Sequence, residues 1–230
     1  PYPVFVTTDA ATNQLHLAFD KVLRTLEQNA LLPKLEALVT GLVAASAAQA
    51  EALQGTELED AASRVAQLYQ VAGAELGLPG ELGPLASAEQ ALVDAHTAAG
   101  ERSPLTGVAI DYSLYAPRGH YTRNAALRRY FTAMSVLGQA AFCLPGTRGC
   151  DGVEPARRGI LAARVLARDP ALVLLWQEIY EPTAFLVGVA DDYTPLEVAA
   201  AGGLLADPAA LADDATVSRI ADTLLTARPV

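Results

Sequence analysis

The segment DYSLYAPRGHYT, Asp111–Thr122, concentrates chemically capable side chains in an otherwise alanine-rich chain. It holds an aspartate, three tyrosines, an arginine and a histidine within twelve residues. Arginine binds a carboxylate or a phosphate through paired hydrogen bonds, and histidine can exchange a proton near neutral pH. The candidate ligand-binding residues here are Asp111, Tyr112, Tyr115, Arg118, His120 and Tyr121.

The same segment leads into a predicted helix, which adds a second reason to expect an anionic ligand. Thr122 is a plausible N-cap, so His120 and Tyr121 would lie at the helix entrance. A helix N-terminus offers free N–H groups and a partial positive charge. Gly119 would let a partner approach the backbone closely. The alternative is structural, with these side chains fixing loops to helices, and the sequence favours that alternative.

A second segment, YEPTAFLVGVADDYTP, supplies the candidate carboxylates Glu181, Asp191 and Asp192. Acid–base hydrolysis needs two carboxyl groups about 5–10 Å apart. The structural alternative places Arg118 in salt-bridge range of one of these three acids, because a buried arginine needs a partner. One of Asp191 and Asp192 would then serve only to stabilise the helix that follows.

The sequence shows few features of a metal site or of a catalytic nucleophile. His16 and Asp20 stand four residues apart on a predicted helix, and His120 could add a third ligand, but the chain has no HExxH sequence. An aspartate that orients a histidine is the favoured arrangement. GxSxG, P-loop and GxGxxG sequences are absent as well. We therefore predict no metal and no cofactor.

Two cysteines in FCLPGTRGCDG are predicted to form a disulfide, Cys143 with Cys150. The Pro and Gly residues between them let the chain turn back, and such a bridge would contribute roughly 2–3 kcal/mol in the chain-entropy model. Two free thiols are the alternative. A bridge would place the protein in an oxidising compartment outside the cytoplasm, secreted, periplasmic or on the cell surface.

Composition limits the partners. The net charge of −10 disfavours nucleic acid and anionic lipid. No uninterrupted apolar run reaches the eighteen or so residues of a membrane helix, so no membrane insertion by this chain is expected. A hydrophobic content of 52% is enough for one sizeable core. We predict a single helical domain over residues 1–230.

Helical periodicity dominates the chain. A first helix carries Leu15, Phe19, Val22, Leu23 and Leu26 on one face. Later helices are predicted at about Leu31–Leu53, Glu57–Leu76, Ser87–Ala99, Thr122–Ala141, Glu154–Ala167, Pro170–Ile179, Pro195–Leu205 and Asp214–Ala227. Thr56 with Glu59 and Thr194 with Glu197 fit capping boxes. The fold class is all-α, with eight to ten helices packed as antiparallel hairpins and a short N-terminal extended segment, Val4–Thr7. A curved helical array or an α/α toroid would suit this pattern, but periodicity does not exclude a compact bundle.

Three segments carry a family resemblance: PYPVFVTTDAATNQLHLAFDKVL, DYSLYAPRGHYTRNAALRRYFTAM and LWQEIYEPTAFLVGVADDYTPLE. Together they resemble the bacterial family known as domain of unknown function 3160. The resemblance implies a mostly helical, secreted or lipid-anchored protein, of which this chain would be a segment or processed part. The sequence departs from the family pattern after Thr8, where DAATNQLH is small and polar. The family brings no activity to carry over.

Two functions from different classes remain open. The first is a binding or scaffolding module that contacts a partner chain, the rest of a larger protein, a peptide or a glycan through the Asp111–Tyr121 region. The second is a hydrolase of a cell-surface polymer that uses His120 with carboxylates. An open cleft holding His120 and two acids would favour the enzyme, and a closed, fully paired network would favour the scaffold. The low aromatic content of 6% disfavours a glycan groove.

Overall fold

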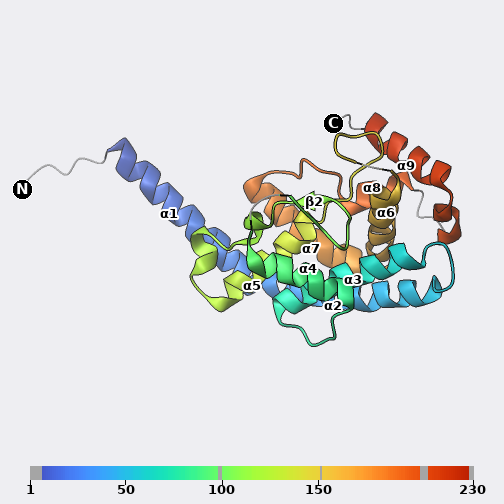
Figure 1. Cartoon of the computed structure of the whole chain (residues 1–230). Coiled ribbons are helices and arrows are strands. Elements are labelled where there is room, and N and C mark those ends of the chain that lie inside the picture. Colours follow the sequence, from blue (N-terminus) through green and yellow to red (C-terminus); the bar gives the residue numbers. More distant parts are fainter. Residues whose placement is uncertain (1–6, 98–99, 151, 203–206, 228–230) are drawn as a thin grey trace, which may run out of the picture.

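A computed structural model of the chain describes residues 7–97, 100–150, 152–202 and 207–227. Its regular structure is almost entirely α-helical, as predicted, apart from one short antiparallel strand pair, β1 (Glu101–Arg102) and β2 (Ala109–Ile110). The helices are α1 Thr8–Leu26, α2 Leu32–Ala52, α3 Glu59–Leu76, α4 Pro84–Ala95, α5 Ala125–Gln139, α6 Glu154–Ala167, α7 Pro170–Val187, α8 Pro195–Ala201 and α9 Asp214–Ala227. Figure 1 shows them gathered into one body from which α1 projects.

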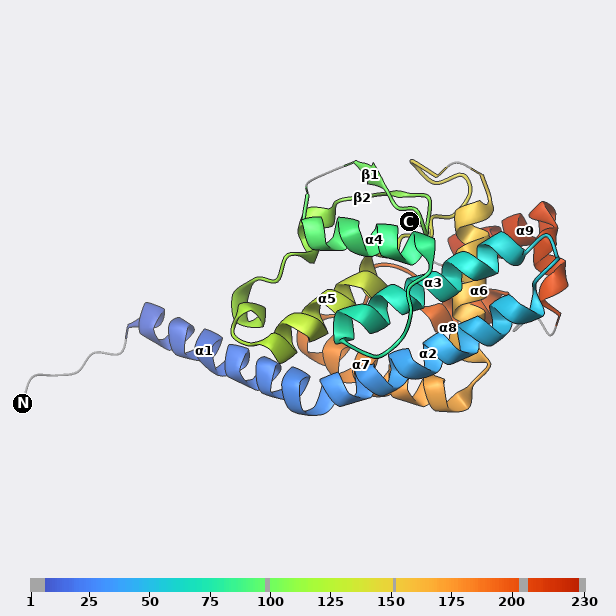
Figure 2. The same cartoon turned by 60° about the horizontal axis from the view of Figure 1, so that its bottom comes forward.

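The first two helices are continuous, although the sequence predicts two separate ones. The π-helical turn Glu27–Leu31 joins α1 to α2 without a break. Pro33 follows this turn and cannot donate the N–H that an α-helix would direct at the carbonyl of Asn29. A wider turn before the proline keeps the helix running, and π-turns of this kind are frequent at functional sites. Figure 2 shows the long helix that results.

The core lies between α2, α3, α5 and α6. The α2–α3 hairpin contributes Leu35, Val39 and Val65, all essentially inaccessible. Leu161 of α6 closes the core from another side, and the Tyr69 hydroxyl donates to the carbonyl of Ala162 at 3.2 Å. α6 is buried on nearly every side, as a helix at the centre of a helical domain must be.

The disulfide is present: Cys143 and Cys150 are bonded, with their Cα atoms 5.7 Å apart. It closes the loop between α5 and α6. At the start of α6 the buried Arg157 donates from Nε to the carbonyl of Leu211 at 2.7 Å, and its guanidinium pairs with Asp214. These contacts join the C-terminal helices to the core, because a buried guanidinium must find acceptors for its donors.

Several predicted helix ends need correction. α5 is capped by Asn124, whose Oδ1 accepts from the N–H of Leu127 at 2.9 Å, so Thr122 is not the cap. α4 starts at Pro84 and ends at Ala95, three and four residues before the predicted Ser87 and Ala99. α7 continues through Pro182 to Val187. The hydroxyl of Thr183, next to this proline, donates to the carbonyl of Ile179 at 2.7 Å.

One of the two predicted capping boxes is confirmed. The side chains and backbone of Thr194 and Glu197 exchange both hydrogen bonds at the start of α8. At α3 the Thr56 hydroxyl accepts from the N–H of Leu58, while the Glu59 carboxylate accepts from the N–H of Gly55. These bonds hold the preceding turn instead of forming a box. The predicted extended segment Val4–Thr7 lies outside the described residues except for Thr7, which caps α1.

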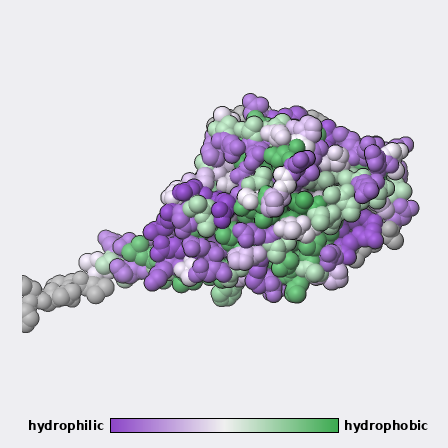
Figure 3. Space-filling model, turned by 90° about the horizontal axis from the view of Figure 1, so that it is seen from below, coloured by the Kyte–Doolittle hydropathy of each residue, from purple (hydrophilic) through white to green (hydrophobic). Residues whose placement is uncertain are grey.

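α1 leaves the first part of its predicted apolar face uncovered, while Leu23 and Leu26 near its end are half-buried. None of its residues is buried, and Leu15, Phe19 and Val22 are 71%, 41% and 57% exposed. Hydrophobic residues on the projecting helix are visible in Figure 3. In the described residues the continuous helix Thr8–Ala52 is long and apolar enough to cross a membrane by length and composition alone. Its α2 half packs into the core, as the central helix of a soluble domain does.

Candidate functional site

The Asp111–Thr122 segment folds into two 3₁₀ turns, Tyr112–Tyr115 and Gly119–Thr122, before α5. The Asp111 carboxylate accepts from the N–H of Ser113 at 3.0 Å and so caps the first turn. Aspartate is suited to this position because its short side chain reaches the backbone two residues ahead. The segment therefore turns twice. Tyr112 and Tyr115 point one way, and His120 and Tyr121 point another.

Tyr112 and Tyr115 point into the core. Their rings are stacked with centroids 5.5 Å apart, and both side chains are fully buried. The Tyr112 hydroxyl donates to Glu89 of α4 at 2.7 Å, and Ser103 donates to the other oxygen at 2.6 Å. Burial, followed by the bond to Glu89, raises the pKa of Tyr112. The buried Glu89 thus has both oxygens satisfied, and this cluster joins α4 to the segment.

His120 and Tyr121 point the other way, toward the long helix. His120 Nε2 lies 2.6 Å from Oε2 of Glu27, and Nδ1 lies 3.3 Å from Oδ1 of Asp20. The Tyr121 hydroxyl donates to the second oxygen of Glu27 at 2.6 Å. Glu27 is only 4% exposed. We call Asp20, Glu27, His120 and Tyr121 the junction cluster.

The junction cluster is closed. Both oxygens of Glu27 and both ring nitrogens of His120 are occupied by protein groups. Tyr121 also packs on Phe131 with ring centroids 4.7 Å apart, and burial, together with the bond to Glu27, raises its pKa. The π-turn places Glu27 on the side of the long helix that faces α5. The cluster therefore fixes the direction in which α1 leaves the body.

The predicted ion pair of Arg118 is not formed. Arg118 is exposed, and no hydrogen bond or salt bridge joins it to Glu181, Asp191 or Asp192, which are exposed too. Gly119 brings the backbone round at φ 58°, which directs His120 and not Arg118 toward the interior. Glu181, Asp191 and Asp192 are therefore not brought to His120. Nearby, Glu178 of α7 pairs with Lys34 of α2 at 2.5 Å.

The three family-like segments nevertheless converge. His120 of Asp111–Met134 contacts Asp20 of Pro1–Leu23, and Thr183 of Leu175–Glu197 lies close enough to Tyr130 of Asp111–Met134 to lower its pKa against the larger effect of burial. His16 remains exposed on α1, so Asp20 orients His120 and not its helical neighbour. Among the described residues, no group of three or more His, Cys, Asp and Glu side chains could hold a metal ion.

Glu27 and Glu89 are the residues that sequence reasoning missed. Glu27 follows Leu23 by four positions and Leu26 by one, so it falls on the predicted apolar face of the first helix. A carboxylate on an apolar face is a signal, because a buried charge requires a partner. Glu89 sits on α4 and carries no comparable signal, since the pattern there is too short.

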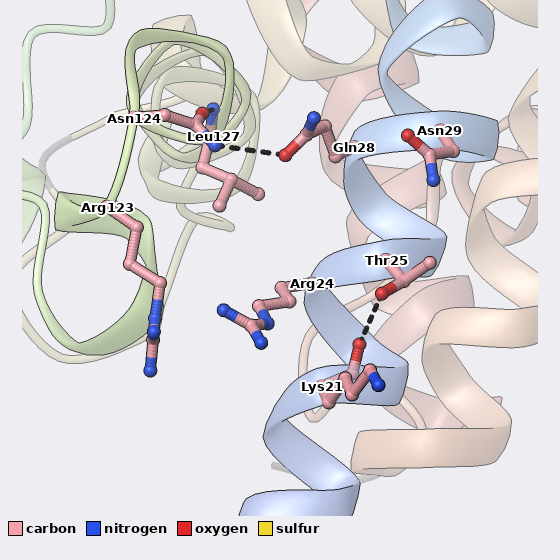
Figure 4. A pocket seen from close by; sticks show the side chains of 8 residues that line it. All are labelled: Lys21, Arg24, Thr25, Gln28, Asn29, Arg123, Asn124 and Leu127. Atoms are coloured by element: carbon pink, nitrogen blue, oxygen red, sulfur yellow. Dashed lines mark hydrogen bonds between the residues drawn. The ribbon is translucent and has the colours of Figure 1, made fainter.

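A shallow hollow lies beside the junction cluster, between the end of α1 and the start of α5, with a volume of about 250 Å³. Figure 4 shows Arg24 at the end of α1 and Gln28 in the π-turn on the side that faces Arg123, Asn124 and Leu127. The amide of Asn124 donates to Gln28 at 3.0 Å across it. Asp20 borders this region and pairs with Arg24 and Arg123.

The family described as "Protein of unknown function (DUF3160)" matches residues 1–229. The chain belongs to this family. The search found no match to a curated protein and none to a solved structure. Membership in DUF3160 confirms the resemblance carried by the three segments, and it assigns no activity to the junction cluster or to the hollow.

Proposed function

We propose that this chain is an extracytoplasmic helical binding or scaffolding module that contacts another protein chain. The observation that carries the proposal is the projecting α1, on which Leu15, Phe19 and Val22 are exposed together. Uncovered apolar side chains of this size in a single helical stripe are typical of interaction surfaces. The junction cluster holds the base of this helix in a fixed direction.

A protein partner fits the surface better than a glycan. Leu15, Phe19 and Val22 stand at i, i+4 and i+7, the spacing with which a helix enters an apolar groove or packs on a second helix. A glycan groove would need aromatic platforms, and Phe19 is the one aromatic side chain in the described part of α1. The partner we expect is a protein with an apolar helical face.

The alternative, a hydrolase, has one observation in its favour: His120 lies between two carboxylates. These acids are Asp20 and Glu27, and not the predicted Glu181, Asp191 or Asp192. Glu27 is buried with both oxygens bonded, so its carboxylate is closed to a substrate, while Asp20 is occupied by His120, Arg24 and Arg123. A catalytic acid or base must reach the proton that it transfers. The closed cluster therefore supports the binding module.

The disulfide supports the proposed location. Bridges such as Cys143–Cys150 persist in oxidising compartments and are rare in the cytoplasm. The compartment implied by the family resemblance is the same.

The experiment that tests the proposal changes the exposed face of α1. Phe19→Glu should weaken concentration-dependent association and lower dye binding by the purified chain, because a charge in the stripe opposes apolar contact. Sedimentation velocity and fluorescence of a hydrophobic dye measure the two effects. The matched control is Asn13→Glu, on the opposite side of the same helix. Identical behaviour of wild type and Phe19→Glu in both measurements would contradict the proposal.

A further inference from the structure

The hollow beside the junction cluster has the character of a small ligand site. Its volume is about 250 Å³, and it opens to solvent. Two walls form it: the end of α1 with the π-turn that follows, and the segment that leads into α5. Figure 4 shows Arg24 and Gln28 on the side of the first wall that faces Arg123 and Asn124. The polar groups that the argument uses are Lys21, Arg24, Gln28, Arg123 and Asn124.

The lining is cationic in an acidic protein. Lys21, Arg24 and Arg123 line the hollow and no carboxylate does, although the chain as a whole carries a charge of −10. Lys21 and Arg24 are spaced at i and i+3, so helical geometry places them on one side of α1, and Gln28 follows in the π-turn. That side is not the apolar stripe, so the hollow and the proposed protein-binding face are separate surfaces.

Asp20 orders the two arginines without neutralising the hollow. Its Oδ2 lies 3.8 Å from Nε of Arg24 and 3.5 Å from a terminal nitrogen of Arg123, while its Oδ1 faces His120. Each guanidinium has five N–H donors, so most of them remain for a ligand. One carboxylate shared by two arginines and a histidine leaves an excess of positive charge beside it.

We propose that this hollow binds a small phosphate-bearing anion, either inorganic phosphate or a phosphate monoester. Two guanidinium forks and an ammonium match the several acceptor oxygens and the double negative charge of phosphate. The Asn124 and Gln28 amides stand next to the cations and suit a polar ester group.

The test is isothermal titration of the purified chain with sodium phosphate, glycerol 3-phosphate and glycerol. We expect one binding event per chain for each phosphate compound and none for glycerol, with affinity that falls as sodium chloride is added. Tighter binding of glycerol 3-phosphate than of inorganic phosphate identifies the monoester as the ligand class. The reverse order identifies inorganic phosphate.

Arg123→Gln and Lys21→Gln should each weaken phosphate binding at least tenfold. The matched control is Arg148→Gln, which removes the same charge from the exposed disulfide loop and should leave affinity unchanged. Circular dichroism confirms that each variant is folded, as expected for changes at exposed positions. Absence of binding up to about 10 mM phosphate, or equal affinity in Arg123→Gln and Arg148→Gln, would overturn the proposal.

Discussion

At the scale of single residues, the chain uses buried carboxylates as fixed acceptors. Glu27 accepts a hydrogen bond from the Tyr121 hydroxyl and contacts His120. Glu89 accepts hydrogen bonds from the hydroxyls of Tyr112 and Ser103. Such groups are tolerated in an interior only because every oxygen has a partner. The conspicuous Arg118, by contrast, is exposed and takes no part in this bonding. The polar segment Asp111–Thr122 is therefore a structural junction whose acids come from other helices.

Glu27→Ala should lower the free energy of unfolding by about 3 kcal/mol, because His120 and Tyr121 would lose buried hydrogen-bond partners together. Urea denaturation measures the change. Arg118→Ala is the control, with an expected change within about 0.5 kcal/mol, as for other exposed side chains. A loss from Glu27→Ala no larger than that from Arg118→Ala would contradict the structural role of the cluster.

At the scale of elements, α1 differs from every other long helix in the described residues because it has no buried side chain. Its end is held by the junction cluster, while its beginning extends away from the body (Figure 2). A helix without tertiary contacts has only marginal stability in water. Helix α3, by contrast, buries one face against α2 and α5, so packing supplies its stability.

Backbone amides of α1 before Asp20 should exchange hydrogen at least about a hundredfold faster than those of α3 in the isolated chain, because their opening requires no loss of packing. Hydrogen exchange followed by mass spectrometry measures both helices in one sample. A partner that covers Leu15, Phe19 and Val22 should slow exchange in α1 alone. Equal protection of α1 and α3 in a monomeric sample would be inconsistent with an uncovered helix.

At the scale of the whole molecule, tyrosines make stability depend on alkaline pH. Burial is the main cause of raised pKa values for Tyr69, Tyr112, Tyr115, Tyr121 and Tyr130. A raised pKa means that the folded chain holds these protons more tightly than the unfolded chain does. Their contribution to stability is complete below pH 10, the ordinary tyrosine pKa, and is lost as pH rises above it.

We therefore expect unfolding to become easier above pH 10, and these five tyrosines to ionise together with unfolding. Tyrosinate absorbance and circular dichroism, recorded on the same alkaline titration, should show coincident transitions. Tyr115→Phe should shift the transition to higher pH, because one proton fewer is released and the hydrogen bond between Tyr121 and Glu27 is kept. Gradual ionisation of all tyrosines near pH 10 in a folded chain would contradict the prediction.

The sequence by itself determined the helical class, the approximate position of most helices, the disulfide and the family. Each depends on local information: the 3.6-residue period, the Thr194–Glu197 capping pair, and two cysteines close enough in sequence to meet. Where two residues close in sequence can both cap a helix, local sequence does not choose between them. Asn124, and not Thr122, caps α5.

Only the tertiary structure decided which polar groups meet. Arg118 and the acids Glu181, Asp191 and Asp192 are plausible partners by type, but the turn at Gly119 directs His120 inward and leaves Arg118 in solvent. Glu27 became the partner of His120 because a π-turn set its side chain toward α5. Ion pairing depends on distances between segments far apart in the chain, and residue types alone do not determine those distances.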